Sequence, residues 1–222
     1  MDFVIYSALA LIYLFLVVRI AAQLSGKRQW LNYAIFQIFV LFSLAYDNGI
    51  IAAGRFIGEG ELLKGLSGVR FWLHAVATPT LILVGYYILR SSQVKFSQHI
   101  ITHITAWLIT VGLIIYQIVS STLQEVKSLI PIEEYGVLRY TSESLAGPPF
   151  MVIIVGFLLL LIGVIVLVKQ KWVWLFVGTL LLFIGQGLQI PVVSTAVTNI
   201  FELILMVSIW ITTSKALDSQ RP

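Results

Sequence analysis

The long apolar stretches of this chain constrain its fold more than any other feature. Seven of them approach the ~20 residues that a helix needs to cross about 30 Å of hydrocarbon. They cover residues 3–24, 31–53, 71–90, 100–122, 149–168, 172–190 and 193–213. Because lipid cannot satisfy free backbone groups, runs of this kind predict helices. We therefore expect residues 1–222 to form one all-α integral membrane domain, a multi-pass bundle of seven transmembrane helices.

The composition agrees with this class. Hydrophobic residues make up 59% of the chain and charged residues only 11%, against roughly 25% charged in soluble domains. The absence of cysteine excludes disulfides, thiolate metal sites and cysteine nucleophiles. The net charge of +4 is not gathered into a basic cluster, so the expected partner is the lipid bilayer and not nucleic acid. The first run lacks a basic leader and a cleavage site, which predicts a retained helix.

The last two runs nearly touch, and Pro191 is the only break signal between them. The alternative is one long kinked helix, although about 40 residues exceed what a single crossing needs.

The distribution of lysine and arginine predicts the orientation, because cytoplasmic loops of membrane proteins collect these residues. With the N-terminus outside and the C-terminus cytoplasmic, the inner side holds the larger basic set: Arg19, Lys27, Arg28, Arg90, Lys95, Lys169, Lys171, Lys215 and Arg221. The outer side then holds Arg55, Lys64, Arg70, Lys127 and Arg139. We expect the N-terminus outside.

Two connecting segments stand out on the predicted outer side. Residues 54–70 combine glycines with charged residues, which is typical either of a solvated loop or of an interfacial or re-entrant piece. Residues 123–148 form the longest connection, and their pattern is too irregular to predict a helix.

Polar residues gather in the predicted outer halves of the helices, whereas the inner halves are almost wholly apolar. Asp47 lies in the sequence Tyr46-Asp47-Asn48, late in the second run, and His74 and Glu202 lie in the third and seventh. Ionisable residues inside membrane-length segments are costly and therefore mark functional sites. This asymmetry predicts a polar cavity that is open to the outer face and sealed below.

We expect a ligand-binding pocket built from residues of four runs and of the segment 54–70. Arg55 and Arg70 are expected at its mouth, where they pair with the acids or attract an anionic head group. The full predicted set is Asp47, Asn48, Arg55, Arg70, His74, Gln189, Asn199 and Glu202.

The same residues suggest two kinds of chemistry. Asp47, His74 and Glu202 are candidate ligands of a divalent metal ion, although catalytic zinc sites usually contain more histidine. Asp47 and His74 are also candidate catalytic residues for general acid–base work. His99 and His103 are predicted roughly 20 Å away on the inner side of the ~30 Å core, so they share no ion with His74 and no haem is expected.

Residues 70–79 resemble the third helix of microbial rhodopsins, in which an arginine precedes Thr-Pro by a similar interval. That family binds retinal through a lysine in its last helix, and the seventh run here has only Lys215, at its inner end. We therefore expect no retinal. The proline signatures of seven-helix sugar transporters and the three zinc-binding histidines of alkaline ceramidases and adiponectin receptors are also absent.

The sequence leaves three functions open. The leading hypothesis is a membrane protein whose outward-facing pocket binds or transports a small polar or amphiphilic ligand. The second is an intramembrane lipid-modifying enzyme, a hydrolase or transferase, that uses Asp47, His74 and Glu202. The third is a structural or assembly subunit without a ligand, in which the polar residues only join helices.

Overall fold

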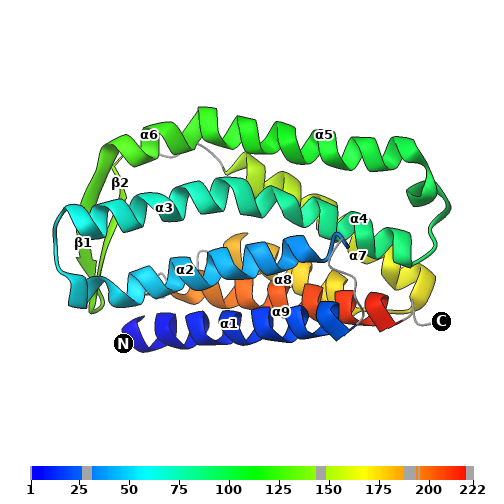
Figure 1. The fold of residues 1–222 in the computed structure, drawn as a ribbon, viewed down its shortest axis with the longest axis horizontal. Helices are drawn as coiled ribbons and strands as arrows, with labels where there is room; N and C mark the ends of the chain where they lie inside the picture. The colour runs from blue at the N-terminus through cyan, green and yellow to red at the C-terminus, as the bar shows by residue number, and fades with distance from the viewer. Residues whose placement is uncertain (1, 27–31, 144–148, 188–193, 195, 219–222) are drawn as a thin grey trace.

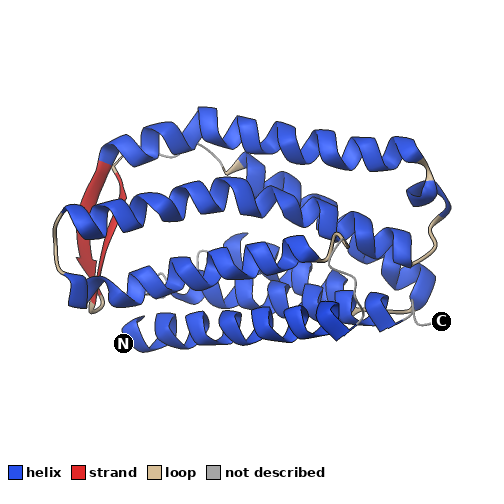
Figure 2. Ribbon diagram, viewed as in Figure 1, coloured by secondary structure: helices blue, strands red, loops and turns tan. Residues whose placement is uncertain are grey.

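The fold is taken from a computed structural model that describes residues 2–26, 32–143, 149–187, 194 and 196–218. The described chain is a bundle of helices whose axes run along one common direction (Figure 1). Two short strands lie together at one end of this otherwise helical molecule (Figure 2). We call this the hairpin end, and the start of α1 and the turn between α2 and α3 lie there as well.

The elements follow the predicted apolar runs. The helices are α1 (Asp2–Gly26), α2 (Ile35–Ile57), α3 (Glu61–Ala77), α4 (Leu81–Ser91), α5 (Ile100–Gln117), α6 (Leu123–Glu125), α7 (Phe150–Gln170), α8 (Trp174–Gly187) and α9 (Ala196–Asp218), and the strands are β1 (Leu129–Glu134) and β2 (Val137–Ser142). Short 3₁₀ or π turns lie between several of them: η1 (Thr78–Thr80), η2 (Lys95–Gln98), η3 (Ile118–Thr122) and η4 (Val126–Ser128).

Six described helical segments are long and apolar enough to cross a membrane, and α8 is apolar but shorter, with 14 residues described. This confirms the all-α class and agrees with a multi-pass membrane protein, while the seventh crossing and the orientation stay predictions. The exposed surface of the bundle is rich in large apolar side chains. On α5 they include Ile101, Leu108 and Ile115, exposed by 73%, 68% and 58%, as expected of a lipid-facing helix.

The segment 54–70 differs from its expected form. Its first residues complete α2, and Gly58 ends that helix with a φ of 82°, a conformation that glycine adopts without steric cost. Helix α3 then begins at Glu61, ten residues before the predicted third run. The segment therefore consists of the end of α2 and the start of α3, joined by a short turn. Its glycines do not prevent helix formation because α2 and α3 pack against each other.

Helices α3 and α4 form one rod that is interrupted at Pro79. Proline has no N–H and its ring clashes with the preceding turn, so residues 78–80 adopt the 3₁₀ turn η1. The hydroxyl of Thr80 donates to the carbonyl of Ala77 at 2.6 Å. This break leaves the side chains of His74 and Thr78 at the kink.

Helix α5 continues past Gln117 through a π turn, Ile118–Thr122, into α6. π turns insert an extra residue per turn and are frequent at functional sites. The residues from Leu123 to Ser128, which we expected to begin an irregular loop, therefore extend the helical rod toward the hairpin end.

The rest of that connection forms an antiparallel hairpin, which we did not predict. Glu134 pairs with Val137 across Tyr135 and Gly136, whose φ values are 51° and 82°. Positive φ at both positions defines the two-residue turn that matches the twist of a hairpin. The side chains of Leu129 and Tyr140 then pack with Leu63 of α3, so the hairpin covers the ends of α2 and α3.

Helices α7, α8 and α9 approach one another closely at glycines, as is common between membrane helices. Gly163 of α7 lies against the backbone of Phe176, whereas Gly178 and Gly185 of α8 face Ser208 and Phe201 of α9. Gly185 follows Gly178 along α8, but its contact Phe201 precedes Ser208 along α9, so the two helices are antiparallel. This excludes the alternative of one long kinked helix.

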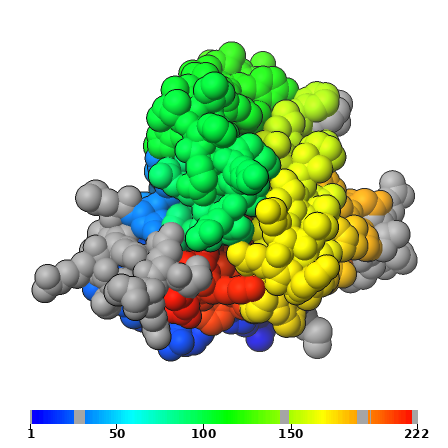
Figure 3. Space-filling model, turned by 90° about the vertical axis from the view of Figure 1, so that its right-hand side faces the viewer, coloured from blue at the N-terminus to red at the C-terminus, as the bar shows by residue number. Residues whose placement is uncertain are grey.

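The end of the bundle away from the hairpin is formed by the termini of α4, α7 and α9, which meet there (Figure 3). Helix α5 lies at the outer edge, farthest from α1 (Figure 1). The largest buried apolar cluster draws side chains mainly from α1, α2, α4, α7 and α9.

Candidate functional site

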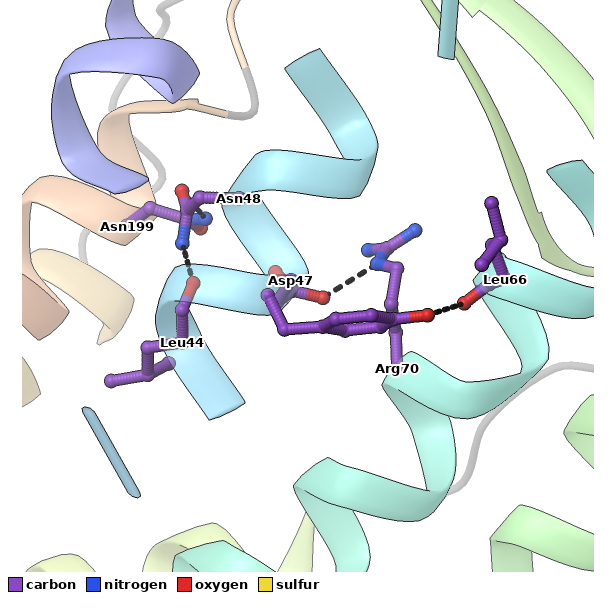
Figure 4. A network of polar contacts seen from close by, with 7 residues as sticks. Leu44, Asp47, Asn48, Leu66, Arg70 and Asn199 are labelled. Atoms are coloured by element: carbon purple, nitrogen blue, oxygen red, sulfur yellow. Dashed lines mark hydrogen bonds and ion pairs between the residues drawn. The ribbon is translucent and has the colours of Figure 1, made fainter. Parts of the chain in front are cut away.

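Three consecutive residues of α2 each reach a different group of a neighbouring helix (Figure 4). The phenol of Tyr46 donates to the carbonyl of Leu66 on α3 at 3.1 Å. The carboxylate of Asp47 accepts from Arg70, also on α3. The amide oxygen of Asn48 accepts from Asn199 on α9 at 3.1 Å. Because successive side chains on a helix point about 100° apart, this short stretch joins α2 both to α3 and to α9.

The pair between Asp47 and Arg70 is the strongest polar contact of this region. Arg70 Nε lies 2.6 Å from Asp47 Oδ1, and the side chains are exposed by only 12% and 29%. Hydrogen bonds between ionised groups are shorter and stronger than neutral ones. The pair therefore neutralises one carboxylate and one guanidinium that would otherwise be costly at this depth.

A cavity of about 280 Å³ lies beside this ion pair. Its walls come from α2, α3, the α5–α6 rod, the start of α7 and α9. Its polar lining consists of Ser43, Asp47, Arg70, His74, Thr78, Gln117, Ser121, Glu125, Asn199 and Glu202. The structure thus brings together five of the residues named from sequence: Asp47, Arg70, His74, Asn199 and Glu202.

His74 lies deeper along its helix than we expected. We predicted it close to the start of the third run, but α3 begins at Glu61, so His74 is about 20 Å along the helix axis. Its ring is exposed to the cavity. Nδ1 lies 3.4 Å from the hydroxyl of Thr78, one turn further on. The imidazole therefore stands near the middle of the rod, at the kink before Pro79.

Glu202 and Asn199 reach the cavity from α9. They are three residues apart and therefore share one helix face. Asn199 is held twice, by Asn48 through its side chain and by the phenol of Tyr13, which donates to its carbonyl at 3.5 Å. Glu202 has no hydrogen bond or ion pair with any residue that the structure describes. Its carboxylate is available to a group inside the cavity.

Five polar lining residues were not among the predicted site residues: Ser43, Thr78, Gln117, Ser121 and Glu125. The last three follow one another at intervals of four along the rod that contains the π turn. A helix places such residues near one face, so the spacing was a usable signal. It was missed because residues after 122 were assigned to a loop. Tyr116 and Ser120 on the same rod are exposed and do not line the cavity.

Three predicted site residues are not placed on the cavity. Asn48 is completely buried between α2 and α9, where it joins helices and does not reach the open space. Arg55 is exposed near the end of α2 and is not part of the lining, because it lies two turns beyond Asp47. Gln189 lies outside the described residues.

The geometry does not assemble the candidate metal site or the candidate catalytic pair. Within the described ranges, no three His, Asp or Glu side chains are placed to hold a metal ion. Arg70, and not His74, is the partner of Asp47, so the expected acid–base pair is not preassembled. Metal binding and lipid-modifying catalysis by Asp47, His74 and Glu202 stay predictions.

The cavity continues into a smaller apolar space of about 50 Å³. The two share His74, Thr78 and Glu202 on their common border. The walls of the smaller space are mainly apolar: Val40, Leu44, Leu81, Val152, Val155, Leu159, Leu182, Leu205 and Met206. The site therefore has a charged chamber and an adjoining apolar one.

The other two histidines lie near the end of the bundle opposite the hairpin. The phenol oxygen of Tyr33 lies 3.2 Å from Nδ1 of His103, and the indole N–H of Trp107 donates to the same oxygen at 3.3 Å. The ring of Tyr86 packs edge-on against His103. This aromatic cluster joins α2, α4 and α5, and His103 takes no part in the cavity.

Comparison of the chain with protein-family models, with curated proteins and with solved structures found no match.

Proposed function

We propose that this chain is a multi-pass membrane protein that binds a small polar or amphiphilic ligand in the cavity, as a binding or transport protein. The observation that carries the proposal is the single cavity shared by Asp47, Arg70, His74, Asn199 and Glu202. Its volume, about 280 Å³, is close to the lower bound of roughly 300 Å³ for small-molecule pockets.

The polar lining supports a ligand site over a purely structural role. The phenol of Tyr46 and the amide oxygen of Asn48 are engaged in hydrogen bonds to neighbouring helices. Glu125 and Glu202, by contrast, have no partner among the described residues, and both line the cavity. Polar residues that only join helices are paired with one another. Unpaired carboxylates beside an open space inside a helical bundle are what a ligand site requires.

The experiment compares two adjacent serines. Ser121 lines the cavity, whereas Ser120 is exposed on the outside of the same turn. We expect native mass spectrometry of the purified wild-type protein to show a retained small molecule. Ser120→Trp should keep the added mass, and Ser121→Trp should lose it because the indole fills the chamber.

Equal retention by the two variants would place the bound molecule elsewhere and contradict the proposal. So would a wild-type protein that carries no added mass and shows no stabilisation by any of the amphiphiles tested below.

A further inference from the structure

The charges that face the cavity are unbalanced. Three carboxylates line it, those of Asp47, Glu125 and Glu202, together with one guanidinium, that of Arg70. Arg70 is paired with Asp47 through Nε at 2.6 Å, while its buried Nη1 has no hydrogen-bond partner among the described residues. Glu125 and Glu202 form no ion pair with a described residue, so two negative charges remain for whatever occupies the space. A buried or half-buried carboxylate needs a partner to stay ionised.

Ser43 provides a second and independent indication of a ligand. It lies one turn before Asp47 on α2, is 6% exposed, and borders the cavity. Its hydroxyl has no hydrogen-bond partner among the described residues. Serines inside membrane helices usually bond the carbonyl four residues earlier, as Ser208 does with Ile204. The hydroxyl of Ser43 is therefore an acceptor and donor left for a bound polar group.

The apolar chamber lies where the tail of such a ligand would lie. It shares Glu202 and His74 with the charged chamber, and beyond them its walls are formed by leucine, valine and methionine. A ligand whose head group meets Glu202 therefore has an adjoining space that favours hydrocarbon, because apolar surface removed from water contributes favourably to binding.

The sign of the charge selects the head group. An anionic head would meet two carboxylates of its own sign, and like charges brought together oppose binding. A neutral head would leave both carboxylates unpaired. An ammonium group carries the charge opposite to the carboxylates of Glu125 and Glu202, and its N–H groups can donate to a hydroxyl such as that of Ser43.

We infer that the ligand is a cationic amphiphile, with an ammonium head group in the charged chamber that Glu125, Glu202 and Ser43 line and a hydrocarbon chain that enters the apolar chamber. This inference rests on the proposed function and specifies the class of ligand that the same cavity takes.

The test uses four probes with the full-length protein in an uncharged detergent: dodecylammonium, dodecanol, dodecanoate and butylammonium. Thermal-shift titration gives an apparent affinity for each, since a ligand that binds the native state raises the melting temperature. We expect dodecylammonium to bind at least about tenfold more tightly than dodecanol or dodecanoate. Butylammonium should bind more weakly than dodecylammonium because it removes less apolar surface from water.

Three variants test the head-group site. Glu202→Gln and Glu125→Gln should each weaken dodecylammonium binding by about tenfold. Glu133→Gln is the matched control, because it removes the same charge from the exposed face of the hairpin, and it should bind as the wild type does. If Glu202→Gln fails to fold, Glu125→Gln on a different helix carries the same test.

The outcomes separate the inference from the proposed function. If dodecanol or dodecanoate binds as tightly as dodecylammonium and Ser121→Trp abolishes that binding, the cavity is a ligand site but the ammonium inference is wrong. If neither Glu202→Gln nor Glu125→Gln weakens the binding of dodecylammonium, the ammonium inference is also wrong. If no probe binds and the wild type retains no small molecule, both fail.

Discussion

At the scale of residues, one short stretch of α2 combines two roles. Tyr46 and Asn48 reach groups on α3 and α9 and join the bundle. Asp47, between them, is part of the cavity wall and is paired with Arg70. A structural role therefore explains the two neighbours, while Asp47 contributes both to stability and to the charge of the site.

The ion pair gives a prediction for stability. Asp47→Asn and Arg70→Gln should each lower the free energy of unfolding by about 1.5–3 kcal/mol, the range for hydrogen bonds to charged groups. The double variant should lose less than the sum, because each single change already breaks the contact. Unfolding of the purified protein by denaturant measures both.

The control is the pair between Glu61 and Lys64 on the surface of α3, which is 3.9 Å long with Glu61 93% exposed. Lys64→Gln should change stability by less than about 1 kcal/mol, as is usual for exposed pairs. Additive losses at Asp47 and Arg70 would show that the two side chains are not coupled.

At the scale of elements, irregular turns surround the cavity. The α3–α4 rod is interrupted at Pro79, and the α5–α6 rod contains the π turn 118–122. The first places His74 and Thr78 at a kink. The second carries Ser121 between Gln117 and Glu125, on the cavity side. Neither rod packs as a straight helix here, and the open space lies between them.

The contact between α2 and the hairpin depends on one glycine. A Cβ on Gly54 would lie 1.8 Å from the carbonyl oxygen of Leu138 in β2, so Gly54→Ala must push the hairpin away. We expect a loss of about 1–3 kcal/mol in unfolding free energy, the usual cost of overpacking. Denaturant unfolding and limited proteolysis of residues 129–142 would measure the effect.

Gly49 on the same helix is the matched control, since a Cβ there meets no atom within 4 Å. Gly49→Ala should be neutral or stabilising by up to about 1 kcal/mol, because alanine favours the helix. If the two alanine variants behave alike, the hairpin does not pack on α2 as described.

At the scale of the whole molecule, the ionisable residues that face open space lie in one part of the described bundle. The cavity lies among polar residues of α2, α3, α5–α6 and α9. Toward the end away from the hairpin, the predicted inner half, large apolar side chains such as Ile209 are completely buried together with single uncharged polar residues such as Gln37 and Thr213. A path across the membrane would require a second arrangement of the helices that opens the inner half.

Single cysteines test both orientation and access, and the chain contains no cysteine that would add background. We expect a water-soluble maleimide to label Ser121→Cys from the outside and to leave Ile209→Cys unlabelled from either side. Labelling of Ile209→Cys from the inside on addition of dodecylammonium would identify a transporter. Labelling of Ser121→Cys only from the inside would reverse the predicted orientation.

The sequence by itself determined the class of this protein, because the length and hydropathy of an apolar run are local properties of the chain. It also indicated Asp47, His74 and Glu202, since an ionisable residue in such a run stands out without knowledge of its neighbours. The sequence did not predict that α3 begins at Glu61 or that residues 129–142 form a hairpin. Glycines and turn residues indicate breaks in the local sequence, and only tertiary packing overrides that preference.

Only the tertiary structure decided which polar residues share one space. Asp47 and Asn48 are adjacent in sequence, yet one faces the cavity and the other is buried against α9. Arg55 and Arg70 are chemically alike, yet of the two only Arg70 is paired with a carboxylate of a described residue. Glu125 belonged to an expected loop and became part of the wall through a π turn. These outcomes depend on how helices rotate and pack against one another, which hydropathy does not encode.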